Sequence, residues 1–311
     1  MRNRIGLIFW AREACLNFRI LVICVVFCLG GGLLASGVKA AEPVSERGLL
    51  IGVAPHTSVR ALFASYQPLS LFLQQALQRD VRIVSAPNFE EFLTRAMAGR
   101  YDIAITTGHQ ARLLQTDAGF LPLVTYQADF RVVWIKAANN HAIHRLEDLN
   151  GQKVLSLGPS SLTALWSAQQ LAERGVVPAE IGYVSASDSV VELILAGSVK
   201  AAALSQANID RLAPHVRQKL HIFESSPSFL GRVYMLNPRL ADEYAAIRQA
   251  LDAYARTEAA QDYFKNNQLV GYRDVPPAEL ELMEPYAQQL REQMKAQDKA
   301  KNTENPTHDA R

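Results

Sequence analysis

The sequence predicts an α/β protein with two similar lobes, each built around a mainly parallel sheet, joined by a hinge of two chain segments. Short apolar runs alternate with amphipathic helices in two successive copies, and this alternation is typical of parallel sheets covered by helices. One apolar segment lies between the two copies and a second one follows them, so the chain is expected to cross between the lobes twice.

The first copy of the pattern predicts lobe 1. Leu69, Leu73 and Leu77 recur every four residues, which places them on one face of a helix. Asn88, with Glu91 three residues later, predicts the start of the next helix in the manner of a capping box. The predicted elements of this copy are strands at 49–53, 81–85 and 101–106 and helices at 66–77 and 88–98.

The second copy predicts a similar lobe 2. Gly175 and Gly197 are expected to end its two helices, because glycine readily adopts the left-handed backbone that closes a helix. The predicted elements of this copy are strands at 153–157, 183–184 and 201–204 and helices at 162–174 and 187–195.

Two apolar segments, 130–135 and 233–236, are predicted to be the crossings of the hinge. A hinge of two crossing segments suits closure of the lobes around a ligand. After the second crossing, only helices are expected. The polar end of the chain, which contains Pro306, is predicted to be a disordered tail. The predicted parts are lobe 1 at 41–135 and 232–294, lobe 2 at 136–231, and the tail at 295–311.

The N-terminal segment 1–40 is predicted to be a cleavable secretory signal peptide. Four arginines precede the apolar run Ile20–Leu34, and small residues follow that run as far as Ala40. The apolar run is shorter than the roughly 20 residues that a membrane-spanning helix needs, so a retained anchor is the weaker alternative. The protein is therefore expected in the periplasm.

Charge and cysteine content argue against several classes of function for this chain. Removal of residues 1–40 changes the net charge from +2 to −2, so a basic surface for nucleic acid is not expected. Cys15, Cys24 and Cys28 all lie in that segment, which leaves the mature chain without a thiol. We recognise no nucleotide-binding motif, no nucleophile elbow and no acid–base pair, so no cofactor, metal or catalytic site is predicted.

Loops that follow the predicted strands supply the candidate ligand site. In open α/β sheets, ligands bind beyond the carboxyl ends of the strands. Lobe 1 offers one loop with His56 and Thr57, a second with Phe89 and a third with His109, whereas lobe 2 offers the loop 158–163.

The lobe 2 loop is the most informative, because Ser160, Ser161 and Thr163 stand at the start of a predicted helix. The free N–H groups and the positive end of the helix dipole favour an anion there, and the hydroxyls add donors without a formal charge. Ordinary helix capping by Ser and Thr explains the same residues and stays open as the alternative.

Four short segments of the chain carry a family resemblance: Ala-Pro-Asn-Phe at 86–89, Ala-Gly-Arg-Tyr-Asp-Ile-Ala at 98–104, Leu-x-Asp-Leu-x-Gly at 146–151, and Pro-Ser-Ser-Leu-Thr at 159–163. Their order and spacing together resemble the periplasmic phosphonate-binding proteins of ABC importers over roughly residues 49–290. The resemblance implies a type II periplasmic-binding-protein-like fold, a small oxyanion of the phosphate or phosphonate type as ligand, an inner-membrane ABC permease as partner, and a monomer.

The resemblance also implies a set of ligand contacts, several of which are changed in this chain. Phe89 stands where the family usually has tyrosine, and Phe130 stands where an aromatic residue covers the ligand; both can pack on a ligand, but neither has a hydroxyl. The family's Ser-Thr-Ser phosphonate cradle falls on Ser161, Leu162 and Thr163, which keeps the two outer hydroxyls.

The remaining implied contacts argue against an amine on the ligand. The family's histidine falls on Ser187, and its two amine-binding acids fall on Ala207 and Arg232. A buried ammonium needs a carboxylate partner, whereas Arg232 repels an ammonium and suits a phosphate or carboxylate. A plain oxyanion or a dicarboxylate-like solute is therefore expected instead of an aminoalkylphosphonate, with a surface ion pair as the alternative role for Arg232.

The stretch 107–113 is similar to a divergent branch of the same superfamily that is often attached to signalling proteins, so a ligand-sensing domain or adaptor for a membrane sensor protein stays open as a second function. His109 in this stretch is expected to donate to the ligand and to titrate near neutral pH, with helix capping as the alternative. A non-transport enzyme is the third hypothesis, because fold alone does not fix function.

Overall fold

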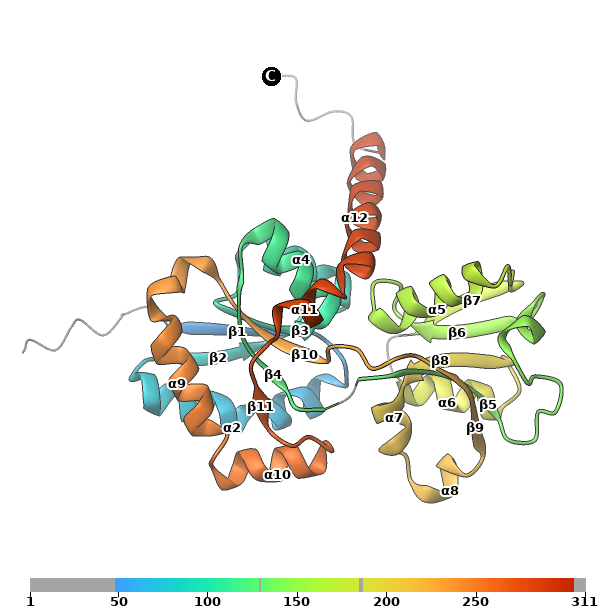
Figure 1. Ribbon diagram of the computed structural model, residues 1–311, viewed down its shortest axis with the longest axis horizontal. Helices are drawn as coiled ribbons and strands as arrows, with labels where there is room; N and C mark the ends of the chain where they lie inside the picture. Colours follow the sequence, from blue (N-terminus) through green and yellow to red (C-terminus); the bar gives the residue numbers. More distant parts are fainter. Residues whose placement is uncertain (1–47, 129, 185–186, 305–311) are drawn as a thin grey trace, which may run out of the picture. The chain divides into compact units, whose positions relative to one another are not determined.

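The structure is a computed structural model that describes residues 48–128, 130–184 and 187–304. These residues form two α/β lobes connected by two chain segments (Figure 1). The predicted signal peptide and residues 305–311 of the predicted tail lie outside the described residues.

Lobe 1 contains a six-stranded mixed sheet in the order β11-β4-β10-β3-β1-β2. The pairs β1–β2 and β1–β3 are parallel, as the repeated pattern predicted, whereas β10 runs antiparallel to both β3 and β4. Its strands are β1 (Leu49–Val53), β2 (Val81–Val84), β3 (Ile103–Thr107), β4 (Leu121–Tyr126), β10 (Arg232–Leu236) and β11 (Tyr272–Arg273). The expectation that only helices follow the second crossing is wrong, because β11 pairs with β4 at the edge of this sheet.

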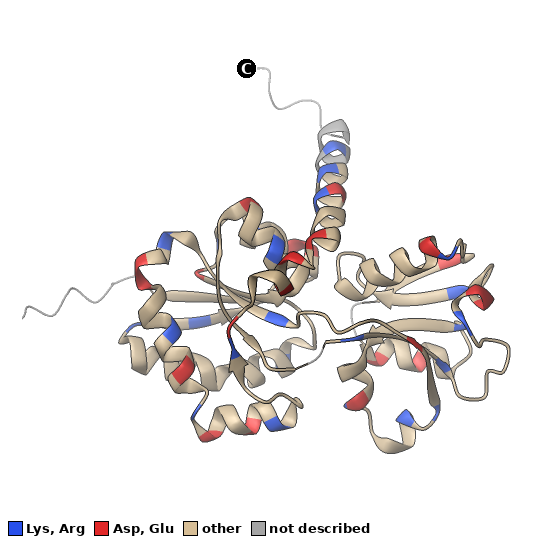
Figure 2. Cartoon of the chain, viewed as in Figure 1, with Lys and Arg blue, Asp and Glu red and all other residues tan. Residues whose placement is uncertain are grey.

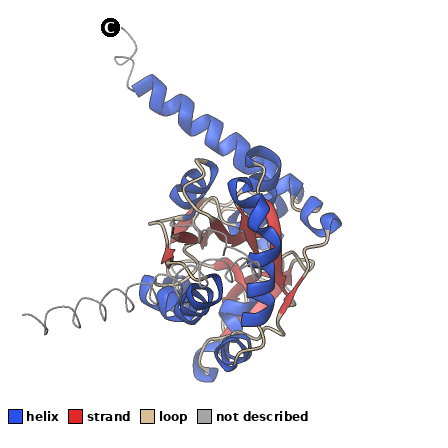
Figure 3. Ribbon diagram, turned by 90° about the vertical axis from the view of Figure 1, so that its left-hand side faces the viewer, coloured by secondary structure: helices blue, strands red, loops and turns tan. Residues whose placement is uncertain are grey.

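Helices cover this sheet (Figure 3). They bury apolar side chains against it. In the first of them, Leu62, Tyr66, Leu69 and Leu73 are buried at helical spacing. That helix begins earlier than the leucine spacing predicted, because the Ser58 hydroxyl accepts from the N–H of Ala61. The helices of this lobe are α2 (Val59–Leu77), α3 (Phe89–Met97), α4 (Gly108–Ala118), η2 (Pro238–Glu243), α9 (Tyr244–Tyr254), α10 (Glu258–Asn266), α11 (Pro277–Glu281) and α12 (Glu284–Glu304).

Lobe 2 contains a five-stranded mixed sheet in the order β7-β6-β8-β5-β9. Its parallel pairs, β6–β7 and β6–β8, come from the second copy of the pattern, and β5 runs antiparallel to β8 and β9. Its elements are β5 (Val132–Ala137), η1 (Leu146–Leu149), β6 (Lys153–Leu157), α5 (Leu162–Glu173), β7 (Glu180–Val184), α6 (Ser187–Leu195), β8 (Ala201–Ser205), α7 (Gln206–Asp210), α8 (Pro214–Arg217) and β9 (Leu220–Ser225).

The second crossing of the hinge was predicted at 233–236, but these residues pair within β10 inside the sheet of lobe 1, so the chain returns before that strand. The first crossing also differs from its predicted position. The sequence placed it at 130–135 and ended the first part of lobe 1 at residue 135, but β5 pairs from Val132 onward inside the sheet of lobe 2. The apolar character of this run therefore reflects burial in that sheet, and the chain crosses before β5 begins. At the crossing, Phe229 N–H donates to the carbonyl of Phe130 at 2.7 Å, so the two connecting segments are paired.

A tight packing contact holds β1 against the chain that enters β3. Gly52 lies over the ring of Tyr101, and a Cβ atom at Gly52 would stand only 2.5 Å from two of the ring carbons. Tyr101 in turn stacks on Phe92 of α3, with ring centroids 5.2 Å apart. The absence of a side chain at Gly52 therefore permits the strand, the ring and the helix to pack together.

The last helix, α12, is longer than predicted. The sequence placed residues 295–304 in a disordered tail, but the helix continues through them to Glu304, with no Gly or Pro inside that stretch to interrupt it. Its first turns contact α4 and α5, and its distal part stands clear of the rest (Figures 1 and 3). The coloured part of this helix carries both acidic and basic residues (Figure 2).

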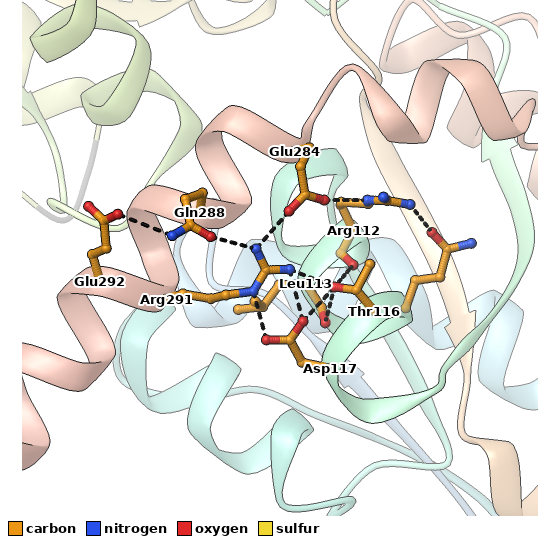
Figure 4. A network of polar contacts seen from close by, with 9 residues as sticks. Arg112, Leu113, Thr116, Asp117, Glu284, Gln288, Arg291 and Glu292 are labelled. Carbon is orange, nitrogen blue, oxygen red and sulfur yellow. Dashed lines mark hydrogen bonds and ion pairs between the residues drawn. The ribbon is translucent and has the colours of Figure 1, made fainter.

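A network of ion pairs anchors α12 on α4 (Figure 4). The Arg291 guanidinium lies 2.8 Å from an Asp117 carboxylate oxygen and 2.7 Å from one of Glu284. Glu284 also contacts Arg112, with Nε and Oε2 2.6 Å apart. The guanidinium of Arg291 holds the pKa of Asp117 below its usual value, so this pairing favours the charged carboxylate.

Candidate functional site

A cavity of about 120 Å³ lies between the two lobes. The chain reaches it from the carboxyl ends of β1 and β3 in lobe 1, from the start of α5 and the end of β8 in lobe 2, and from both connecting segments. This is the position that the strand-end rule predicted for a ligand.

Six of the residues predicted to bind a ligand line this cavity: His56, Phe89, Phe130, Ser161, Thr163 and Arg232. Ser160 and Thr57 line a neighbouring hollow of about 460 Å³ instead. Ser187 begins α6 and is not among the lining residues of either space.

The start of α5 supplies backbone donors at the cavity wall. The Ser161 hydroxyl accepts from the N–H of Ala164 at 3.2 Å, so the capping role that the sequence left open for this residue is present. Helix geometry leaves the N–H groups of Leu162 and Thr163 without an intrahelical acceptor, and among the described residues neither donates to another group. Both residues line the cavity, so its wall includes the residues that carry these two free backbone donors and the Thr163 hydroxyl.

Arg232, at the start of β10, is held in place by tyrosines. Its guanidinium donates to the hydroxyls of Tyr66 at 3.3 Å and Tyr263 at 3.2 Å. Burial alone would lower the pKa of Arg232, but its interactions with these tyrosines and with Tyr126 outweigh burial and raise the pKa. Arg232 therefore stays a cation, and its half-buried side chain forms part of the cavity wall.

The tyrosines under Arg232 form a continuous network of hydroxyls. Tyr126 bonds to Tyr234 at 2.7 Å and to Tyr263 at 3.2 Å, and Tyr234 bonds to Tyr272 at 2.9 Å. Burial raises the pKa of Tyr126 and Tyr234 well above the ordinary value, so these hydroxyls are neutral at physiological pH. The network orients Arg232 without cancelling its charge.

The cavity lacks acidic residues among its described lining, although it contains both Arg232 and Arg211. Neither arginine forms an ion pair with a described residue, so the surface ion pair considered for Arg232 is not observed there. The described residues also contain no group of three His, Cys, Asp or Glu side chains arranged to hold a metal ion. The electrostatic environment favours an anion.

His56 faces this environment as a neutral ring. Its Nδ1–H donates to the carbonyl of Ala54 at 2.8 Å, which leaves Nε2 as the unprotonated nitrogen. Burial, followed by the positive charge of Arg232, lowers the pKa of His56 well below 6.5.

His109 does not act as the sequence predicted. Its Nε2–H donates to the carbonyl of Ser160 at 3.1 Å, its Nδ1 lies 3.1 Å from the hydroxyl of Thr107, and the residue is fully buried outside the cavity lining. Burial lowers its pKa to about 4, so the expected titration near neutral pH is wrong. His109 instead joins the start of α4 in lobe 1 to the loop before α5 in lobe 2.

Sequence reasoning missed several polar residues of the cavity wall: Thr107, Tyr126, Ser205, Asn208, Arg211 and Asn267. Ser205 could have been found by the rule already applied to the other strands, because it ends β8. Arg211 gave no such signal, since it lies just after the short helix α7 and reaches the cavity only through the packing of lobe 2.

Comparisons with known proteins give a family match and similar folds. A family model described as "ABC transporter, phosphonate, periplasmic substrate-binding protein" matches residues 51–280. No curated protein sequence matches the chain. Among the described residues, no helix combines the length and the apolar character needed to span a membrane.

Solved structures show the same fold at low sequence identity. PhnD1 of Prochlorococcus marinus, solved with methylphosphonate, superposes with a TM-score of 0.68 at 14% identity, covering 79% of this chain and 99% of that chain. A binding protein component of a Pseudomonas aeruginosa ABC phosphonate transporter gives 0.65 at 14% identity, covering 81% and 99%. XAC2383 of Xanthomonas citri, solved with ATP, gives 0.68 at 19% identity, covering 79% and 98%.

Proposed function

We propose that this chain, which belongs to the family of periplasmic substrate-binding proteins of phosphonate ABC transporters, holds a small oxyanion between its lobes and delivers it to an importer in the inner membrane. Proteins of this family bind substrates for transport and are not enzymes. The proposal includes export by a signal peptide that is cleaved after residue 40, and function as a monomer.

The prediction of an anionic ligand rests on one observation. Arg232 and the start of α5 line the same cavity, and the described lining residues include no acid. The N–H groups of Leu162 and Thr163 are directional donors, and Arg232 adds a full positive charge. An oxyanion can accept from both. An ammonium group would meet Arg232 with no carboxylate among the described lining to compensate it.

Titration calorimetry on the protein purified from the periplasm tests this function, with phosphate, phosphite, methylphosphonate and sulfate as ligands. At least one of these anions is expected to bind, and Arg232→Gln should weaken that binding by about 10- to 100-fold, which is the range for loss of a charged hydrogen bond. Arg82→Gln is the matched control, because Arg82 is exposed on β2 and forms only a solvent-exposed pair with Asp80. Failure of every anion to bind would refute the proposal.

Delivery to an importer needs a separate experiment. Proteoliposomes that contain the permease and ATPase encoded beside this chain should accumulate the bound anion only when the protein is supplied. If the neighbouring genes instead encode a membrane sensor, and the protein changes that sensor's activity in response to the anion, the sensing role replaces the transport role.

A further inference from the structure

The cavity receives one arginine from each lobe. Arg232 lies at the start of β10 in lobe 1, and Arg211 lies just after α7 in lobe 2. Desolvation, followed by the charge of Arg232, lowers the pKa of Arg211, so the two guanidinium groups are close enough to repel each other. Two like charges from opposite lobes therefore line one cavity, where the Arg232 side chain is half-buried and that of Arg211 is more exposed.

The protein orients these two charges without neutralising them. Arg232 donates to two tyrosine hydroxyls, and Arg211 donates to the carbonyl of Ala207 at 3.0 Å and to Oδ1 of Asn208 at 3.4 Å. All of these acceptors are uncharged, and burial raises the pKa of the Tyr66 hydroxyl well above the neutral range. The cavity therefore keeps two positive charges for its ligand, in addition to the backbone donors of α5.

The volume and the apolar wall of the cavity indicate a ligand that is larger than a single small anion and partly apolar. A buried water requires at least roughly 10–15 Å³ of such space, so a cavity of about 120 Å³ has room for several waters. A five-atom anion such as sulfate fills only part of that volume. Phe89, Phe130, Leu157 and Leu269 make much of the remaining wall apolar, which suits a methylene spacer and not a second hydrated ion.

We propose that the ligand is a two-ended dianion: a phosphonate or similar oxyanion and a carboxylate, joined by a short methylene chain. This proposal rests on the proposed function and extends it. The oxyanion accepts from the start of α5, the carboxylate accepts from Arg211 and Arg232, and the spacer lies against the apolar wall. Bidentate pairing with a planar carboxylate is the geometry that guanidinium groups favour.

Titration calorimetry on the full exported protein tests the proposal with three probes that differ at one end: 3-phosphonopropionate, methylphosphonate and 2-aminoethylphosphonate. The carboxylated probe is expected to bind at least about tenfold more tightly than methylphosphonate, and the aminated probe should bind most weakly. Equal affinity for the carboxylated and methyl probes, or tightest binding of the aminated one, overturns the proposal while leaving the oxyanion-binding function intact. Absence of binding by all three overturns the proposal, and the oxyanion-binding function fails with it only if phosphate, phosphite and sulfate also fail to bind.

Arg211→Gln separates the two ends of the ligand. The variant should lose about tenfold or more in affinity for 3-phosphonopropionate and much less for methylphosphonate. Arg217→Gln removes the same charge from the same lobe at an exposed site outside the cavity lining, and should leave the preference for the carboxylated probe unchanged. If Arg211→Gln weakens both probes equally, or if Arg217→Gln reproduces its effect, Arg211 acts only through the general electrostatic field and the proposal fails. Matching melting curves for both variants confirm that the fold is retained.

Discussion

His109 in lobe 1 donates a hydrogen bond from Nε2 to the backbone carbonyl of Ser160 in lobe 2. Because the acceptor is a carbonyl, this bond fixes the ring as the Nε2–H tautomer, and the Thr107 hydroxyl is left to donate to Nδ1. The bond joins the two loops at which α4 and α5 begin, so it forms only when the lobes are close together.

This buried histidine should make the protein less stable at mildly acidic pH. The pKa of His109 is about 4 in the folded protein and about 6.5 when unfolded, so the unfolded state binds more protons between these values. The free energy of unfolding should therefore fall by about 3 kcal/mol from this residue as pH drops from 6.5 to 4.

Urea denaturation at a series of pH values measures this contribution in the wild type and in His109→Gln, which keeps a donor for Ser160 without a titrating ring. The variant should show a shallower loss of stability. His141→Gln is the control, since His141 is exposed. Identical pH profiles for His109→Gln and the wild type would show that the ring is not held neutral by burial.

Ligand binding should be linked to proton uptake at His56. The charge of Arg232 contributes to the lowered pKa of His56 in the free protein, and a bound anion offsets that charge. The pKa should therefore rise on binding, so affinity should increase as pH falls through the pKa of the bound state. Calorimetry near pH 6 in buffers of different ionisation enthalpy counts the protons, and His56→Gln with the same anion should take up fewer. Equal uptake by both proteins contradicts this linkage.

The ion pairs at α12 should stabilise the protein as a coupled unit. Arg291 contacts both Asp117 and Glu284, and its side chain is only 17% exposed. A double-mutant cycle with Arg291→Ala and Asp117→Ala should give a coupling free energy of about 1 kcal/mol or more. The exposed pair Arg82–Asp80 is the control and should couple by less than about 0.5 kcal/mol. Similar values for the two pairs would mean that the network does not act as a unit.

Gly52→Ala should destabilise lobe 1 by about 1–3 kcal/mol, the usual cost of overpacking. The new methyl group would meet the Tyr101 ring at 2.5 Å, and that ring is fixed on Phe92. Gly158→Ala provides the comparison, because nothing lies within 4 Å of a Cβ atom there. Denaturant midpoints that shift equally for both variants would show that the ring moves aside without cost.

The sequence predicted best where local signals and burial agree. The apolar run at 153–157 is β6 to the residue, and Leu69 and Leu73 are buried as their spacing predicted. The prediction failed where the polarity of a segment has a different structural cause from the one assumed. Residues 132–135 are apolar because they lie in the sheet of lobe 2, and residues 295–304 are polar although they are helical. Neither outcome is encoded in periodicity alone.

The candidate site shows the same division. Ser161, Thr163 and His56 were accessible to sequence reasoning because they follow strands. Arg211 was not, because a residue beyond a five-residue helix reaches a cavity only by long-range packing. The pKa of His109 was mispredicted for a related reason. The local sequence around a loop histidine does not show whether the opposite lobe buries its ring.

The contact of α12 with both α4 and α5 has a consequence for kinetics. Separating the lobes requires α12 to leave α5, in addition to bending of the two connecting segments. It would also disturb the edge-to-face contact between the rings of Tyr286 and Phe229. Entry and escape of a solute should then be limited by how rarely the lobes part and not by diffusion. Long residence of the solute can arise from this gating even when its direct contacts are few.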